Sequence, residues 1–147
     1  MGFGKRSGQW AHLVSGENTP LVRTWFGDEG GWRELLSATR APSIDGFLAY
    51  VDVVEDPSLD GATPSQVAAL LPTKSEYSIA ILADQRSMTD AEQPLLVVLD
   101  NGSGDPPELR VVPSALWCIE NNMSLANMYW EDFVGAADKD GVLRSVD

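Results

Sequence analysis

The stretch that decides the fold is ELRVVPSALWCIENNMSLANMYWEDFVGAA, residues 108–137. Leu109, Val111 and Val112 are typical of a short, buried strand. Pro113 follows at the first position of a predicted helix, where proline is tolerated because no backbone amide donor is needed there. Apolar residues then recur with a helical period, so the stretch predicts a strand that runs directly into a helix.

An asparagine-rich turn separates this helix from a second one. Asn121 and Asn122 are expected to end the first helix, because Asn tolerates the left-handed conformation found at helix C-termini. Asn127 stands where the N-cap of the second helix is expected. Apolar residues then recur at the spacing of one helix face, at Trp130, Phe133, Val134 and Ala137.

Strands and helices alternate in the part of the chain that precedes this stretch. Helices are expected after Asp28 and after Thr63, which both suit the N-cap position. A loop rich in Gly and Pro precedes the strand at 109–112 and predicts an antiparallel hairpin. The order of elements predicts an α/β fold, with a mixed, mostly parallel five-stranded sheet and helices packed on it; an α+β two-layer sandwich is the alternative. The other four strands are expected at 21–26, 47–54, 77–83 and 95–99.

Composition narrows the class of protein. A chain of 147 residues, 44% of them hydrophobic, suits one globular domain, and we expect a flexible N-terminal tail over 1–19 and a single α/β domain over 20–147. The net charge of −12 argues against nucleic-acid binding, because phosphate contacts need Lys and Arg on one face. The chain shows neither a signal peptide nor an apolar run of membrane-spanning length, so we expect a cytoplasmic protein that does not bind membranes.

Acidic residues follow four of the predicted strands, at Asp28, Asp56, Asp84 and Asp100. Ligands of open parallel sheets bind at the carboxyl ends of the strands, so these carboxylates would converge if the strands are parallel. Such a cluster would suit Mg²⁺ or Ca²⁺, which prefer oxygen ligands. The simpler interpretation, which we favour, is that these residues cap turns and helices.

Amides and aromatic residues gather around the turn between the two C-terminal helices. Asn121, Asn122 and Asn127 either cap these helices or form a hydrogen-bonding surface flanked by Trp117 and Trp130. A nucleophilic catalytic site has little support, because the sole histidine of the chain lies in the predicted tail. No glycine-rich phosphate-binding motif occurs, and we expect no cofactor.

Several segments carry a resemblance to a known family. They include Leu21-Val22-Arg23-Thr24, Phe26, Asp28, Trp32, Arg110-Val111-Val112-Pro113-Ser114, Glu120-Asn121-Asn122 and Ala126-Asn127-Met128. In these positions the chain resembles an uncharacterised family of small acidic bacterial domains that is typical of actinobacteria. The resemblance spans about 21–144 and departs from the family pattern at Trp25, where an Asp is usual. The resemblance implies that these residues form one domain, and no established activity comes with it.

Charge, size and motifs together favour a non-enzymatic protein-binding module. Such a module would resemble an immunity protein or an inhibitor, presenting acids and aromatic residues to a basic protein partner. The alternative is a divalent-metal or small-ligand-binding enzyme that uses the strand-end aspartates. A third possibility is a self-associating accessory domain with Trp117 and Trp130 at its interface.

Overall fold

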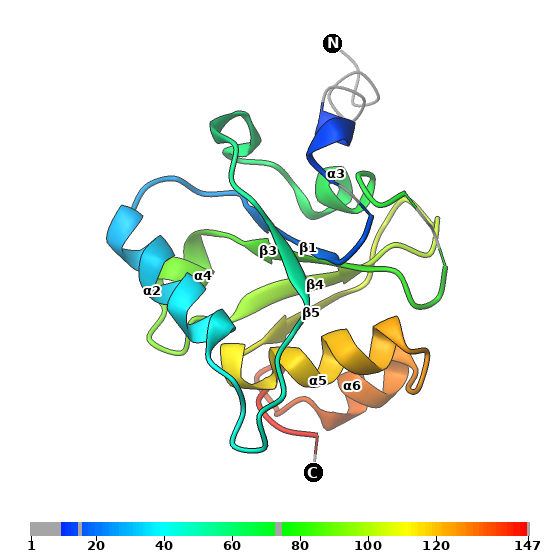
Figure 1. Ribbon diagram of the computed structural model, residues 1–147. Coiled ribbons are helices and arrows are strands. Elements are labelled where there is room, and N and C mark those ends of the chain that lie inside the picture. Colours follow the sequence, from blue (N-terminus) through cyan, green and yellow to red (C-terminus); the bar gives the residue numbers. More distant parts are fainter. Residues whose placement is uncertain (1–9, 15, 73–74, 147) are drawn as a thin grey trace.

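The computed structural model describes residues 10–14, 16–72 and 75–146 (Figure 1). Its elements, in chain order, are η1 (Ala11–Leu13), β1 (Thr19–Arg23), α2 (Glu29–Arg40), β2 (Val51–Val54), η2 (Pro57–Leu59), α3 (Pro64–Ala68), β3 (Ile79–Ala83), α4 (Gln85–Thr89), β4 (Leu95–Leu99), β5 (Glu108–Val111), α5 (Pro113–Ser124), α6 (Trp130–Ala136) and β6 (Val142–Leu143). No helix among these residues is long and apolar enough to span a membrane.

The strands form one mixed sheet in the order β2-β1-β3-β4-β5-β6. β1 pairs in parallel with β2 and β3, whereas β4 is antiparallel to both of its neighbours, β3 and β5. The predicted α/β class and the β4–β5 hairpin are therefore confirmed. The prediction of five mostly parallel strands is wrong, because β4 runs against its neighbours and β6 adds a short parallel strand beside β5. β6 has two residues, too few to show an alternating pattern in the sequence.

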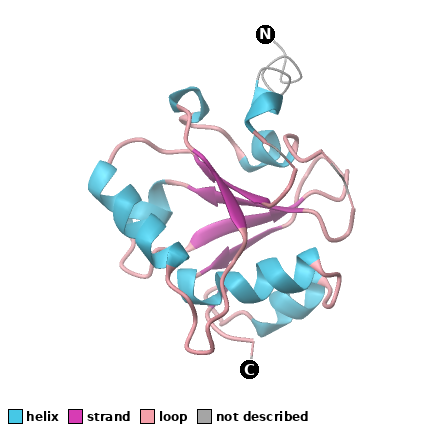
Figure 2. Ribbon diagram, viewed as in Figure 1, coloured by secondary structure: helices cyan, strands magenta, loops and turns pink. Residues whose placement is uncertain are grey.

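Helices cover both faces of the sheet, and the fully buried strands β3 and β4 are apolar throughout (Figure 2). On one face, Ile81 and Val97 pack in a core cluster with residues of α2, α5 and α6. On the other face, Leu82 and Val98 pack with residues of η2 and α3. Trp10 also belongs to this second cluster, so the described end of the predicted tail packs against the sheet.

Helix α5 ends later than the asparagines predicted. Asn121 and Asn122 lie inside the helix, and Ala126 takes the left-handed conformation, with φ of 55°. The amide of Ala126 donates to Met123 O (3.1 Å) and that of Asn127 to Asn122 O (2.8 Å), the paired hydrogen bonds of a Schellman motif. Asn127 therefore belongs to the end of α5, and the N-cap of α6 is Tyr129 instead.

Replacing the left-handed alanine should stabilise the protein. Ala126→Gly is expected to raise the free energy of unfolding by about 1 kcal/mol, because the left-handed conformation strains a residue with a Cβ atom. Urea denaturation at pH 7 measures the change. Ala38→Gly, the same substitution inside α2, should lower the free energy of unfolding by about 1 kcal/mol. Equal losses in both variants would contradict the strain assigned to Ala126.

Candidate functional site

Three of the strand-end acids follow the carboxyl ends of the parallel strands β1, β2 and β3 and so lie at one end of the sheet. Each caps the turn or helix that follows it. Asp28 accepts a hydrogen bond from the amide of Gly31 (2.9 Å), as the N-cap of α2. Asp56 and Asp84 accept from the amides of Ser58 (2.9 Å) and Ser87 (3.2 Å) in the same way. Their carboxylates therefore serve the local fold, as the simpler interpretation of the sequence predicted.

Asp100 lies at the opposite end of the sheet, so the expectation that all four acids converge is wrong. It follows β4, which runs antiparallel to β3, and its amide donates to Ser78 O (2.8 Å) just before β3 begins. Within 10–14, 16–72 and 75–146, His, Cys, Asp and Glu form no group of three or more that could hold a metal ion.

Asp84 has a second partner that links two strands of the sheet. Arg110 on β5 donates from Nη1 (2.8 Å) and Nη2 (2.7 Å) to the two carboxylate oxygens of Asp84, and from Nη1 to Pro94 O (3.1 Å). Desolvation raises the pKa of Asp84, but the hydrogen bonds and charge of Arg110, with the hydrogen bonds from Ser87, outweigh it and hold the pKa below its ordinary value. The pair is half-buried and works as a structural clamp.

The buried side chain of Arg23 anchors a cluster of ion pairs at the same end of the sheet, which the sequence analysis did not predict. Its guanidinium is 1% exposed and lies 4.2 Å from the ring centroid of Phe26. It contacts Glu29 at 2.6 Å and Glu55 at 3.5 Å, and the indole nitrogen of Trp32 donates to both oxygens of Glu55. These contacts tie β1 to α2 and to the end of β2.

The predicted amide and aromatic residues divide between structural and surface positions. Trp130 is buried in the core, and Trp117 stacks on Phe47 with ring centroids 4.8 Å apart. Asn122 donates to Cys118 O (2.8 Å) within α5, and Asn127 is exposed on the turn. Of these predicted residues, Asn121 is the one that lines the pocket described next.

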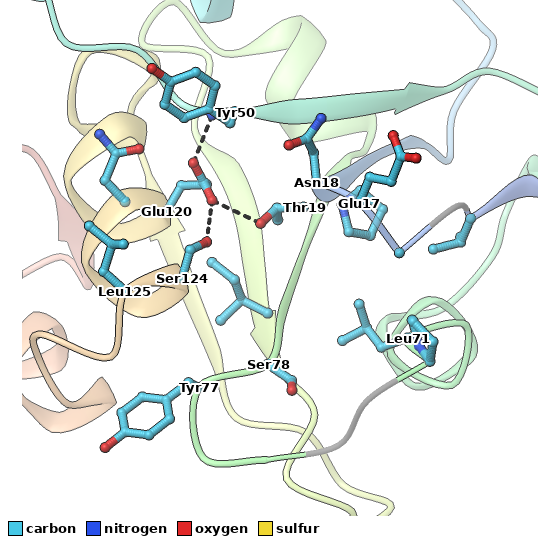
Figure 3. Close-up of a pocket in the computed structure, with 16 residues that line it drawn as sticks. Glu17, Asn18, Thr19, Tyr50, Leu71, Tyr77, Ser78, Glu120, Ser124 and Leu125 are labelled. Carbon is cyan, nitrogen blue, oxygen red and sulfur yellow. Dashed lines mark hydrogen bonds between the residues drawn. The ribbon is translucent and has the colours of Figure 1, made fainter.

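A pocket of about 490 Å³ opens at the amino ends of β1 and β3, beside the C-terminal half of α5 (Figure 3). This is the opposite end of the sheet from Asp28, Asp56 and Asp84. Its walls combine apolar residues with polar and aromatic ones. They include Pro20, Leu71, Ile79, Tyr50, Tyr77 and Ser124. A concave, mostly apolar cavity with a few convergent polar groups is the usual form of a ligand site.

A buried carboxylate, that of Glu120, forms part of the pocket wall. Glu120 is 2% exposed and accepts hydrogen bonds from the Tyr50 amide (2.7 Å), the Thr19 hydroxyl (3.0 Å) and the Ser124 hydroxyl. Its fourth donor is the Asn121 amide (3.0 Å), in the side-chain orientation that also lets Asn121 donate to Leu48 O (3.1 Å). Figure 3 shows the carboxylate between Tyr50, Thr19 and Ser124. This residue joins α5 to β1 and to the segment before β2.

The pocket is acidic. Glu17 and Glu120 are the charged residues among its described lining residues, and both are acids. In the described part of the chain, no Lys, Arg or His forms an ion pair with Glu120. The four donors around Glu120 match a carboxylate, which accepts hydrogen bonds and donates none. Among the described residues, the Glu120 carboxylate in the pocket wall therefore has hydrogen-bond donors and no cationic partner.

Exposed hydrophobic side chains form part of the pocket mouth. Tyr50 and Leu125 are 66% and 70% exposed, and both line the pocket. Tyr129 is also exposed and stacks against Tyr77, with ring centroids 6.3 Å apart. A hydrogen bond with the side chain of Glu76 raises the pKa of Tyr77 above its ordinary value. The mouth thus combines apolar and aromatic side chains with the exposed acid Glu17, and the buried Glu120 carboxylate lies in the wall.

Besides Asn121, the sequence held one further signal for this site. Glu120 lies on the same helix face as the buried Leu116, Ile119 and Met123, where a charged residue is unusual. Thr19, Tyr50 and Tyr77 gave no comparable signal, because they meet Glu120 or the pocket only through the tertiary fold.

Fold and site together define a small α/β domain with an acidic pocket at one end of a mixed sheet. The chain belongs to the family described as domain of unknown function DUF6924, whose model matches residues 18–146. Among curated proteins and among solved structures, no match to the chain was found.

Proposed function

We propose that the protein is a cytoplasmic, non-enzymatic binding module for a basic protein partner, in the manner of an immunity protein or an inhibitor. The partner docks on the face that surrounds the pocket, with Tyr50 and Leu125 at its centre. The observation that carries this proposal is the pairing of exposed apolar side chains with a buried, acidic interior in one cavity.

Charge and surface chemistry support the same partner class. The net charge of −12 attracts a basic protein over long distances and disfavours acidic ones. Contiguous exposed hydrophobic residues on a protein surface mark interaction sites, and aromatic residues dominate the binding energy of many interfaces. The alternative, a divalent-metal enzyme built on strand-end aspartates, has less support because Asp28, Asp56 and Asp84 already accept hydrogen bonds as caps.

The test begins with photo-crosslinking of the protein to its partners in lysate of the source organism, followed by mass spectrometry. Each captured partner is then purified, and its affinity is measured by calorimetry at low and high salt. We expect a partner rich in Lys and Arg whose affinity falls with added salt and falls about tenfold or more for the double variant Tyr50→Ala, Leu125→Ala.

Val134→Ala is the matched control, because Val134 is an exposed apolar residue on α6 outside the pocket lining. It should leave the affinity unchanged. An acidic partner, or a basic partner that binds the double variant as tightly as the unmodified protein, would argue against the proposal.

A further inference from the structure

We propose that the pocket receives one cationic side chain, a lysine or an arginine of the docked partner, and that Glu120 is its counter-charge. This inference rests on the proposed function and adds the chemistry of the group that enters the pocket.

The first step concerns charge. A buried carboxylate is costly to keep unless hydrogen bonds and an opposite charge compensate it. Thr19, Ser124 and the Tyr50 amide supply hydrogen bonds to Glu120, but these groups are neutral. Since none of the described residues gives Glu120 an opposite charge, a positive charge in the cavity would add that compensation, whereas an anionic or neutral group would not.

The second step concerns the atoms that would touch the cation. The Ser124 and Thr19 hydroxyls donate their protons to Glu120, so their oxygen lone pairs remain available as acceptors. Both residues line the pocket. An ammonium or guanidinium group has donors only and so complements these oxygens without displacing any hydrogen bond of Glu120.

The third step concerns shape. The apolar walls at Pro20, Leu71 and Ile79 suit the methylene stem of a long side chain, which buries its carbon atoms while its charged end meets polar groups. Tyr50 and Tyr77 lie at the rim of the pocket with their rings directed outward in Figure 3, and tyrosine rings attract cations that approach such a rim. The volume of about 490 Å³ accommodates one such side chain.

The test titrates the full-length protein with N-acetyl-lysine methylamide and follows backbone amide signals by NMR. N-acetyl-norleucine methylamide is the neutral control of nearly the same shape, and N-acetyl-arginine methylamide separates arginine from lysine. We expect a cationic probe to shift the amide signals of Tyr50 and Ser124, with an affinity about tenfold above that of the norleucine probe.

Glu120→Gln removes the charge while keeping the hydrogen bonds. The glutamine oxygen can accept from the Tyr50 and Asn121 amides, and its nitrogen can donate to the Thr19 and Ser124 hydroxyls, which accept as readily as they donate. This variant should bind lysine and norleucine probes equally. Leu125→Lys places a cation at the mouth and should weaken binding of the lysine probe, whereas Val134→Lys adds the same charge outside the pocket lining and should not.

The outcomes separate this inference from the proposed function. Equal binding of lysine, arginine and norleucine probes to the unmodified protein would overturn the inference, even if the partner still needs Tyr50 and Leu125. The inference would also be overturned if a cationic probe binds Leu125→Lys and a folded Glu120→Gln variant as tightly as it binds the unmodified protein. Spermidine binding far more tightly than the lysine and arginine probes would assign the pocket to a free polyamine instead. A further outcome is that probe binding depends on Glu120, while the partner binds the double variant Tyr50→Ala, Leu125→Ala as tightly as the unmodified protein. That result would support a cation site and reject the docking face.

Discussion

Arg110→Met will lower the free energy of unfolding by about 3 kcal/mol at pH 7, because it leaves the half-buried Asp84 carboxylate without its cationic partner. Urea denaturation measures the loss. Arg86→Met is the matched control, because Arg86 pairs with Asp90 on the exposed side of α4 at 3.7 Å. Exposed pairs of this kind contribute about 0.5 kcal/mol, so the control should lose no more than that.

The pH dependence gives this prediction a second readout. The folded-state pKa of Asp84 lies below its ordinary value, so its ion pair stabilises the unmodified protein above about pH 4, and the stabilisation is lost as the pH falls through the folded-state pKa. In Arg110→Met the uncompensated desolvation favours the protonated carboxyl. The difference in stability between the two proteins should therefore be largest near pH 7 and shrink below pH 4. A difference that stays constant with pH would mean that Arg110 acts through packing alone.

The second large effect is expected at Glu120. Glu120→Ala should lower the free energy of unfolding by about 3 kcal/mol, because it strips an acceptor from the Tyr50 amide and from the Thr19 and Ser124 hydroxyls at once. Glu120→Gln should lose about 1 kcal/mol or less, since it can satisfy the same groups. Thermal and urea unfolding of both variants measure the two losses. If both variants are equally unstable, the charge of Glu120 supports the fold itself, and the hydrogen bonds do not explain its burial.

Local signals in the sequence predicted much of the fold. The N-cap residues Asp28 and Thr63 located α2 and α3, and the apolar runs located β3 and β4. Each of these signals depends on residues within one or two turns of each other. The direction of β4 and the presence of β6 depend instead on pairing with distant strands, which no local pattern records.

The candidate site was harder to predict for the same reason. The strand-end acids were predicted to converge because the carboxyl ends of parallel strands lie at one end of a sheet. Hydrogen bonds from nearby backbone amides already explain why Asp occurs at positions 28, 56 and 84. The pocket lies at the other end of the sheet, where residues from β1, β3 and α5 meet. The signals that could have pointed to it were Glu120, a charged residue on a buried helix face, and the neighbouring Asn121.

The hydrogen bond from Thr19 to Glu120 spans 101 positions of the chain, and this separation determines when the pocket can form during synthesis. A nascent polypeptide emerging from the ribosome exposes β1 long before it exposes α5. The cavity therefore closes only after translation of α5, and on the proposed function an unfinished chain cannot engage a partner through it. The topology itself thus couples formation of the cavity to completion of the C-terminal region.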